Sequence, residues 1–571
     1  ALALAQVAEP AVLDAGKGHG ATLLHHISAQ GNGFELPPAR PGDDEDQRMQ
    51  RLHDDPRYFP GAELGKAQRA AMGQVGLTGR NTASFDPTST LVRPAMRVTH
   101  GSRQPRFGKP VGQDDVVVVP EFFCTENDMS VYMGLAGEVE LLGDGLQDVR
   151  GSVGFQQVME RVCEYFSIAE EGRELSVSWY KDGTGAEPIR SGSVADCRER
   201  DDCIAFVSFG APVDISFSRH DSEEVIDFPL PNGLLCIFGP EVRVQWRQDI
   251  RTPPAAQGAC VGCVLIAITG RLKGKSKDDL LKSRPSNKAV RQGGLVQRAF
   301  LRPSMRILTT PSSPRYERPV SHDDVIVVPE FFCAADDWDL YYQLLREMRQ
   351  SQAEGERNAE WLSWHEGAHL LSKNPNGSEA YRRVIDRICE YFSIAQGDRQ
   401  ETRWIGTRFN WYRDGSDWKP FHHDSAAFNA QRALNQNCTV GVSFGASREL
   451  AFRHARTGEL VYFPQTNGML FFFGRDVNIR WQHGINALPP NEQDGKGRIS
   501  IILWGLCTTA IEEPGSPAML VDETRGGAYA YHAGRRGPAD GRPAPLCRNF
   551  QKGSCSYGAR CKFVHAGNRA Y

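Results

Sequence analysis

Three residues in the C-terminal half of the chain have the types and spacing of a metal site. His422 and Asp424 lie two residues apart at the end of the run FNWYRDGSDWKPFHHD, so on an extended strand both side chains leave the same face. A third candidate, His483, follows two apolar runs, GMLFFFG and VNIRW. Two imidazoles and a carboxylate can occupy one face of an octahedral metal and leave three positions open, as in non-haem Fe(II) oxygenases. The spacing therefore predicts a site for Fe(II), which Mn, Co and Ni would also fit.

Polar residues near these ligands predict a site for an anionic cosubstrate. Asn410 and Tyr412 alternate to one face of the strand that precedes the His422 and Asp424 pair. Arg498 opens the run RISIILWG, in which it and Ser500 alternate with apolar residues. An arginine that faces inward on such a strand needs an anion, and a dicarboxylate would provide one in a bidentate, charge-assisted pair.

A comparison of the chain with itself shows a duplicated domain. The segment DDVVVVPEFFC, ending at Cys124, recurs as DDVIVVPEFFC, ending at Cys333, and WYKDG from Trp179 recurs as WYRDG from Trp411. The copies are far too long for solenoid repeats. In the second copy, helical spacing predicts a helix over residues 378–392. Short β-rich runs separated by Gly, Asp, Asn and Pro follow it and indicate a sandwich or jelly roll.

The first copy serves as an internal control for the proposed site. In the alignment of the two copies, Ser178, Arg190, Gly192, Gln248 and Cys263 replace Asn410, His422, Asp424, His483 and Arg498, respectively. Tyr180 matches Tyr412, but a tyrosine beside a strand tryptophan is readily kept for packing. We therefore predict that the first copy keeps the fold and lacks the metal. It would serve as a platform for dimer-like packing or substrate binding, or would only stabilise its neighbour.

With these motifs in order, the second copy resembles the AlkB-like family of Fe(II)/2-oxoglutarate dioxygenases. The resemblance covers N-x-Y-x-D-G, H-x-D, the S-F-G-A strand, the distal histidine and the arginine strand, over most of residues 324–507. It implies that His422, Asp424 and His483 bind Fe(II). It also implies that Asn410, Tyr412 and Arg498 hold 2-oxoglutarate. The family oxidises N-methyl groups with O2, usually on nucleic-acid bases, and releases formaldehyde, succinate and carbon dioxide.

Two positions depart from the pattern of this family. Its arginine strand commonly reads R-x-N-x-x-x-R, whereas here Ser500 replaces the asparagine and Trp504 replaces the second arginine. In the family the second arginine helps to fix the cosubstrate or a catalytic partner. The departures therefore bear on turnover and on the choice of substrate.

The C-terminal segment PLCRNFQKGSCSYGARCKFVH predicts a zinc finger. Its spacing is C-x7-C-x5-C-x3-H, and the four ligands are Cys547, Cys555, Cys561 and His565. Three thiolates and one imidazole make a closed tetrahedral Zn(II) site that supplies the folding energy of so small a module.

The finger resembles the CCCH fingers that bind single-stranded RNA. By this resemblance Tyr557 and Phe563 are candidates to stack on bases. Arg548 and Lys562 are candidates to contact phosphates, as are Arg560 and Lys552. Some fingers of this type bind proteins instead. A single finger binds weakly, so it would act as a tether that raises the local concentration of RNA.

A segment found only in the second copy contains HEGAH, residues 365–369, which matches the metalloprotease pattern H-E-x-x-H. No further ligand follows it clearly, so a protease site is disfavoured. We expect instead that Trp361, Trp364 and His369 belong to a lid over the iron site.

Composition and charge limit the other possibilities. The net charge is −4, so nucleic-acid binding must be local to one part of the chain, and no apolar run is long enough to span a membrane. Cysteines in strand-like apolar runs fit a reducing compartment, nuclear or cytoplasmic.

The sequence as a whole predicts a mainly β chain with flanking helices, made of two tandem double-stranded β-helix (jelly-roll) domains and a CCCH finger. The predicted parts are a largely disordered region (1–90), the degenerate copy (91–271), a linker (272–300), the catalytic copy (301–510), a flexible linker (511–544) and the finger (545–567). We expect demethylation of N-methylated bases in RNA or DNA. The alternatives are a protein hydroxylase or demethylase, and a non-catalytic RNA-binding scaffold. The oligomeric state is left open.

Overall fold

A computed structural model gives the structure of the chain. It describes residues 94–142, 149–180, 189–191, 203–219, 224–251, 262–273, 302–354, 362–363, 370–371, 375–395, 405–415, 417–488, 492–512 and 515–520. The N-terminal region, most of both predicted linkers and the predicted finger lie outside these residues. The helices and strands named below all belong to one compact unit, residues 1–519. None of its described helices is both long and apolar enough to cross a membrane.

A common order of elements occurs twice along this unit, and the second copy adds further elements to it. The first copy contains β1 (Met96–His100), β2 (Asp115–Val119), α4 (Ser130–Leu142), η2 (Val149–Gly151), α5 (Val153–Phe166), β3 (Glu174–Tyr180), β4 (Ile189–Ser191), β5 (Cys203–Gly210), β6 (Val213–Arg219), β7 (Val225–Leu230), β8 (Leu235–Phe238), α6 (Pro240–Gln245), β9 (Trp246–Arg251) and β10 (Cys263–Gly270).

The second copy begins with β11 (Met305–Thr309), β12 (Val320–Ser321), β13 (Asp324–Val328), α8 (Asp339–Glu354), β14 (Leu362–Ser363), β15 (Leu370–Leu371), η4 (Pro375–Gly377), α9 (Glu379–Tyr391) and β16 (Gly406–Tyr412). It continues with β17 (Lys419–His422), η5 (Ser425–Ala427), α10 (Ala430–Ala433), β18 (Cys438–Gly445), β19 (Arg448–His454), β20 (Leu460–Gln465), β21 (Leu470–Gly474), α11 (Arg475–Arg480), β22 (Trp481–Ile485), β23 (Arg498–Gly505) and β24 (Ala510–Ile511). The elements that the second copy adds to the common order are β12, β14, β15, η5, α10 and β24.

Helix α9 shows how local sequence determines an element of this fold. Ser378 is its N-cap, and the hydroxyl of Ser378 accepts a hydrogen bond of 3.0 Å from the backbone N–H of Tyr381. Tyr381, Val384 and Ile388 follow at helical spacing and are buried. They pack against the second-copy sheet through Phe409 and other strand residues. The helix predicted over residues 378–392 is therefore confirmed.

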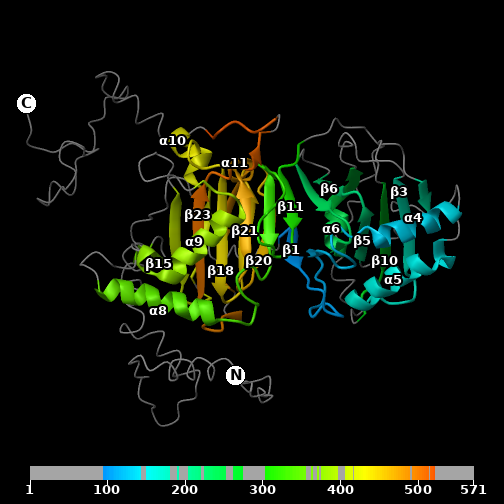
Figure 1. Ribbon diagram of the computed structural model, residues 1–571, viewed down its shortest axis with the longest axis horizontal. Coiled ribbons are helices and arrows are strands. Elements are labelled where there is room, and N and C mark those ends of the chain that lie inside the picture. The colour runs from blue at the N-terminus through cyan, green and yellow to red at the C-terminus, as the bar shows by residue number, and fades with distance from the viewer. Residues whose placement is uncertain are drawn as a thin grey trace, which may run out of the picture. The chain divides into compact units, whose positions relative to one another are not determined.

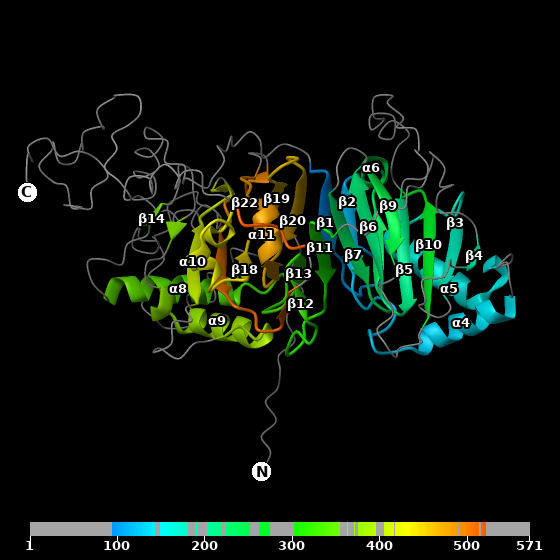
Figure 2. The ribbon, with the colours of Figure 1, turned by 90° about the horizontal axis from the view of Figure 1, so that it is seen from above.

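Each copy is a sandwich of a larger and a smaller sheet. In the second copy the larger sheet, here called the major sheet, has the order β14-β15-β16-β23-β18-β21-β13-β11. The smaller, here called the minor sheet, has the order β17-β22-β19-β20. Figures 1 and 2 show α8 and α9 lying along one side of the major sheet, and residues of both helices share a hydrophobic core with it. The other face of the major sheet turns towards the minor sheet. The prediction of a mainly β fold with jelly-roll domains and flanking helices is confirmed.

The two copies are joined by shared sheets, which the sequence did not predict. Strand β20 of the second copy pairs in parallel with β1 of the first, and β11 of the second pairs in parallel with β7 of the first. Each of the two 11-stranded sheets therefore combines the major sheet of one copy with the minor sheet of the other. The pairing covers strand edges that would otherwise be open to another chain.

Side-chain contacts between the copies occur in matched pairs. Arg219 of the first copy pairs with Glu459 of the second, and His454 of the second pairs with Glu224 of the first at 3.2 Å. Such exchanged contacts are those of a two-fold interface between like subunits. The first copy thus packs on the second as a subunit would, and its strand β1 pairs with the edge strand β20 of the minor sheet that carries His483.

Strand pairing in the two copies supports most of the alignment between them. Tyr180 pairs with Cys263 as Tyr412 pairs with Arg498. Phe217 pairs with Gln248 as Phe452 pairs with His483. These matched registers place Cys263 and Gln248 at the positions of Arg498 and His483.

The alignment of Arg190 with His422 is wrong, because the structure places the two residues in sheets that do not correspond. Strand β17 lies in the minor sheet, where His422 pairs with His483. Strand β4 instead pairs with β3, and Arg190 lies opposite Ser178. The segment that carries metal ligands in the second copy has therefore left the minor sheet in the first. Gly192, aligned with Asp424, lies outside the described residues.

Candidate metal centre

The predicted ligands come together where β17 and β22 run side by side. His422 ends β17 and is the register partner of His483 on β22, and Asp424 lies just after β17 at the N-cap of η5. All three side chains are buried. The structure thus brings together two histidines that are far apart in the sequence, together with the carboxylate of the H-x-D motif.

The distances between donor atoms fit a shared metal ion. The Nε2 atom of His422 lies 4.0 Å from one carboxylate oxygen of Asp424, and the Nε2 atom of His483 lies 3.9 Å from the other. One ligand atom from each residue can be chosen so that all lie within 4.8 Å of one another. Metal–ligand bonds of about 2.1 Å place donor atoms roughly 3–4 Å apart, so only a small contraction is needed. Among the described residues, no other group of His, Cys, Asp or Glu meets this criterion.

Burial sets the protonation state of His483. It lowers the pKa of this imidazole to about 4, against the opposing effect of the Asp424 carboxylate. At neutral pH the imidazole is therefore uncharged, which leaves a nitrogen lone pair for a metal. His483 is thus suited to bind a cation without first losing a proton.

Asp424 is held by neighbouring polar groups as well as by the strand. The hydroxyl of Thr439 on β18 donates to the Asp424 carboxylate at 2.7 Å. The Asp424 backbone N–H donates to the side-chain oxygen of Asn478 at 2.8 Å, and the Asn478 amide donates back to the Asp424 carbonyl at 3.2 Å. His423 points the other way, as its spacing predicts, and its Nδ1 lies 2.6 Å from the Asn478 carbonyl oxygen. These contacts orient the H-x-D segment, as outer-shell partners of metal ligands do.

Replacing Thr439 with valine is expected to weaken metal binding by about 10–100-fold, which is the usual cost of losing an outer-shell partner. Valine keeps the shape of the side chain but removes the donor to the Asp424 carboxylate. Titration with Mn(II), followed by the electron paramagnetic resonance of the free ion, gives the dissociation constant. Thr439→Ser keeps the hydroxyl and should bind as the wild type does. Equal affinity in the valine variant would show that this hydrogen bond does not orient the ligand.

The predicted cosubstrate residues lie on the inner face of the major sheet. Tyr412 and Arg498 are register partners on β16 and β23, and Asn410 and Ser500 form the next pair on this face. The cavity that they line also contains Asp424 and His483. Asn410, Tyr412 and Arg498 therefore face the candidate metal ligands within one pocket, here called the central pocket.

Arg498 is buried, and no carboxylate of the described residues forms an ion pair with it. Its Nε donates to the hydroxyl of Ser443 at 2.7 Å, and its guanidinium lies 5.2 Å from the centre of the Tyr412 ring. Its Nη1 is buried and has no hydrogen-bond partner among the described residues. A buried guanidinium that keeps donors free is costly unless an anion binds it. Arg498 thus has the surroundings expected of an anion-binding residue.

Arg448 is a buried residue of this site that the sequence analysis missed. Its guanidinium donates to the backbone carbonyls of Asp414 and Asp417, in the turn before β17, and to the carbonyl of Asn486, just after β22. It therefore ties together the two strands that carry His422 and His483. The alignment of the copies could have found it, because VSFGAPV in the first copy matches VSFGASR in the second, with Val213 in place of Arg448.

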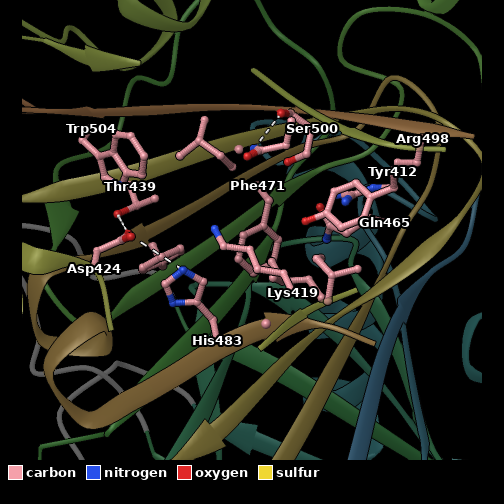
Figure 3. Close-up of a pocket in the computed structure, with 17 residues that line it drawn as sticks. Tyr412, Lys419, Asp424, Thr439, Gln465, Phe471, His483, Arg498, Ser500 and Trp504 are labelled. Carbon is pink, nitrogen blue, oxygen red and sulfur yellow. Dashed lines mark hydrogen bonds and ion pairs between the residues drawn. The ribbon is translucent and has the colours of Figure 1, made fainter. Parts of the chain in front are cut away.

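Lys419 is the second residue that the sequence analysis missed. It lies on β17, is buried, and lines the central pocket. Burial lowers the pKa of its ammonium to about 7, while the Asp424 carboxylate acts in the opposite direction. Figure 3 shows Lys419 between the end of the pocket with Asp424 and His483 and the end with Tyr412 and Arg498.

Trp504, which stands in place of the second arginine of the AlkB-like pattern, lies at the metal end of the pocket. Figure 3 shows it beside Thr439 and Asp424. The guanidinium of Arg408 lies 5.3 Å from its ring centre. Its indole N–H is buried, and no acceptor lies within hydrogen-bond range in the described part of the structure. Trp504 thus forms a wall of the pocket and provides no charge.

The predicted lid residues Trp361, Trp364 and His369 lie outside the described residues. The short strands near them are described. Strand β15 pairs with β14 and also with β16, where Leu371 is the register partner of Asn410. The segment unique to the second copy therefore extends the major sheet beside the strand that carries Asn410 and Tyr412. A lid role for the three residues stays a prediction.

Comparison with known proteins identifies the C-terminal segment. Residues 545–566 match the family model of the CCCH-type zinc finger. This segment is a zinc finger. Its predicted zinc ligands (Cys547, Cys555, Cys561 and His565) and predicted RNA contacts (Arg548, Tyr557, Lys562 and Phe563) lie outside the described residues.

The other comparisons concern the whole chain. No curated protein matches it in sequence. Among solved structures it is similar to an oxidoreductase of the 2OG-Fe(II) oxygenase family from Burkholderia pseudomallei, with 13% sequence identity and a TM-score of 0.19. That match covers 33% of this chain and 88% of the other.

Proposed function

We propose that the second copy is an Fe(II)- and 2-oxoglutarate-dependent dioxygenase of the AlkB type. The proposal rests on one observation, which is that the candidate metal ligands and Arg498 face each other across the central pocket. Buried His422, Asp424 and His483 cluster at one end. At the other end, Arg498 keeps a buried donor for which the described residues provide no acceptor. A metal ion with three open positions and an anionic cosubstrate would together occupy such a pocket.

The charges that line the pocket favour a dianion. Arg498 and Lys419, whose pKa burial lowers to about 7, are the lining basic residues, and Asp424 is the lining carboxylate, among the described residues. A bound divalent metal would add further positive charge in a buried space, where unbalanced charge is costly. A dicarboxylate that reaches from the metal towards Arg498 would offset this excess. This supports 2-oxoglutarate over a neutral ligand.

The residues of the second copy would divide the work of catalysis. His422, Asp424 and His483 would hold Fe(II), and Thr439 and Asn478 would keep Asp424 in place. Arg498 and Tyr412 would bind the distal carboxylate, and Asn410 would orient the cosubstrate. Iron and 2-oxoglutarate, when bound, would allow O2 to oxidise a substrate C–H bond, with release of succinate and carbon dioxide. Hydroxylation of an N-methyl group would then release formaldehyde.

The zinc finger bears on the choice of substrate. CCCH fingers commonly bind RNA, and this one matches their family model. We infer that it brings RNA to the second copy, and that the substrate is an N-methylated base in RNA, with DNA as the related possibility. A linked module raises the local concentration of its ligand without adding to the catalytic pocket. The first copy would serve as the packing partner of the second and would bind no iron.

Succinate release tests this proposal. The wild type and His422→Ala are compared on methylated RNA, methylated DNA and a methylated histone-like peptide. We expect wild-type turnover to be highest on RNA and to fall to background in the variant. Gln248→Ala changes the matching position of the first copy and should leave turnover unchanged. Equal succinate release by the wild type and His422→Ala on every substrate would contradict an enzyme, and turnover on the peptide alone would favour a protein hydroxylase or demethylase.

A further inference from the structure

Lys419 is a buried cation at the centre of the proposed active site. It starts β17, the strand that ends at His422, and only 6% of the residue is exposed. It lines the same pocket as Asn410 and Arg498. A buried ammonium is costly unless anionic or polar groups surround it. Its position therefore needs a functional or structural reason.

The charges around Lys419 show where an anion would bind. The carboxylate that stabilises its charged form belongs to Asp424, whereas Arg408 and Arg498 oppose it. Asp424 already accepts a hydrogen bond from Thr439 and is the proposed carboxylate ligand of the metal. In Figure 3, Lys419 lies between the Asp424 end and the Arg498 end of the pocket. An anion bound between the metal and Arg498 would lie beside the Lys419 ammonium.

We propose that Lys419 is a positioning residue for the cosubstrate, and that its ammonium binds the carboxylate of a 2-oxoacid next to the metal. Arg498 would bind the other carboxylate, at the far end of the pocket. This inference rests on the proposed function of the second copy. Lys419 would supply, from the minor sheet, a cation that β23 does not provide because Trp504 occupies the position of the second arginine.

The place of Lys419 on its strand explains why it would act at the metal end. Its register partner is Ile485, and the pairing of β17 with β22 shifts between Lys419 and His422. This irregularity lets residues three apart lie on the same face of the minor sheet, which regular alternation would forbid. Lys419 and His483 therefore line the pocket from the minor sheet, whereas Arg498 lines it from the major sheet.

Binding measurements with Mn(II) in place of iron test the inference without turnover. Calorimetry gives the dissociation constant of 2-oxoglutarate for the Mn(II)-loaded wild type, Lys419→Met and Lys419→Arg. We expect the methionine variant to bind 2-oxoglutarate at least tenfold more weakly and the arginine variant to recover part of the loss. The methionine variant should also bind pyruvate more weakly, because pyruvate keeps the carboxylate next to the metal and lacks the distal one. Lys496→Met, at a partly exposed lysine before β23, is the matched control and should bind as the wild type does.

The affinity for Mn(II) alone separates this role from a purely structural one. Removing a cation near Asp424 should leave Mn(II) binding unchanged or make it tighter. Weaker binding of both Mn(II) and 2-oxoglutarate would overturn the inference, because a damaged fold predicts that result. Unchanged 2-oxoglutarate binding in Lys419→Met would also overturn it, as would a loss confined to 2-oxoglutarate with pyruvate unaffected. If the wild type itself bound no 2-oxoglutarate, the proposed function would fail first.

Discussion

A chain with Asp424→Ala is expected to bind no iron in either copy while it keeps one zinc in the finger. The substitution removes one of three proposed ligands and leaves His422 and His483, whose Nε2 atoms lie 4.0 and 3.9 Å from the carboxylate oxygens of Asp424. Loss of an outer-shell partner alone costs about 10–100-fold in metal affinity, so loss of a ligand should cost well over about 100-fold. Elemental analysis of the purified full chain, loaded without oxygen, measures both metals.

The same measurement tests whether the first copy has lost its metal site. The wild type should hold one iron, and Gln248→Ala should hold as much, because it alters the first-copy position that matches His483. One iron retained in Asp424→Ala would contradict the assignment of the site or place a metal in the first copy. The full chain is the right material, because the copies share both large sheets and either copy alone would expose strand edges.

The candidate site could be predicted from the sequence where regular alternation decides which way a side chain points. His422 and Asp424 are two apart, and Arg498 and Ser500 alternate with apolar residues, so a strand places each pair on one face. The structure places Arg498 and Ser500 on the wall of the central pocket. Helix α9 could be predicted for a similar reason, because Ser378 precedes apolar residues at helical spacing.

Lys419 could not be predicted because it breaks that rule. It lies three residues before His422, so regular alternation would place the two on opposite faces. The register shift in β17 brings both to the same face of the minor sheet, and no pattern in the run WKPFHH signals such a shift. Arg448 differs, since a comparison of the copies reveals an arginine where the first copy has Val213. What the sequence does not reveal is that its partners are the carbonyls of a turn.

The shared sheets also lie beyond the sequence pattern. Strands β1 and β11 read MRVTH and MRILT, and their alternation indicates which side chains are buried. The alternation does not indicate which strands pair with β1 and β11. Each strand pairs on one edge within its own copy and on the other edge with the opposite copy. The duplication made two like copies available, and the matched contacts of Arg219 and His454 show that they pack as a pair.

Replacing Arg498 with methionine is expected to weaken 2-oxoglutarate binding to the Mn(II)-loaded chain by at least about 30-fold. Truncating one partner of a buried, hydrogen-bonded charge pair costs about 2–5 kcal/mol, and about 1.4 kcal/mol is a factor of ten in affinity. Arg498 fits this case because it is buried and its Nη1 has no hydrogen-bond partner within the described residues. The effect should largely disappear for pyruvate, which lacks the distal carboxylate that Arg498 would bind.

The comparison of the two 2-oxoacids assigns the two cations to different ends of the cosubstrate. Arg498→Met should affect 2-oxoglutarate and spare pyruvate, whereas Lys419→Met should weaken both. Arg432→Met removes a charge from the exposed helix α10 and controls for the net charge of the protein. Equal losses for both 2-oxoacids in Arg498→Met would place Arg498 at the metal end, and no loss for either would remove it from the cosubstrate site. A selective loss for 2-oxoglutarate would orient the dicarboxylate along the central pocket, with the metal at the Trp504 end.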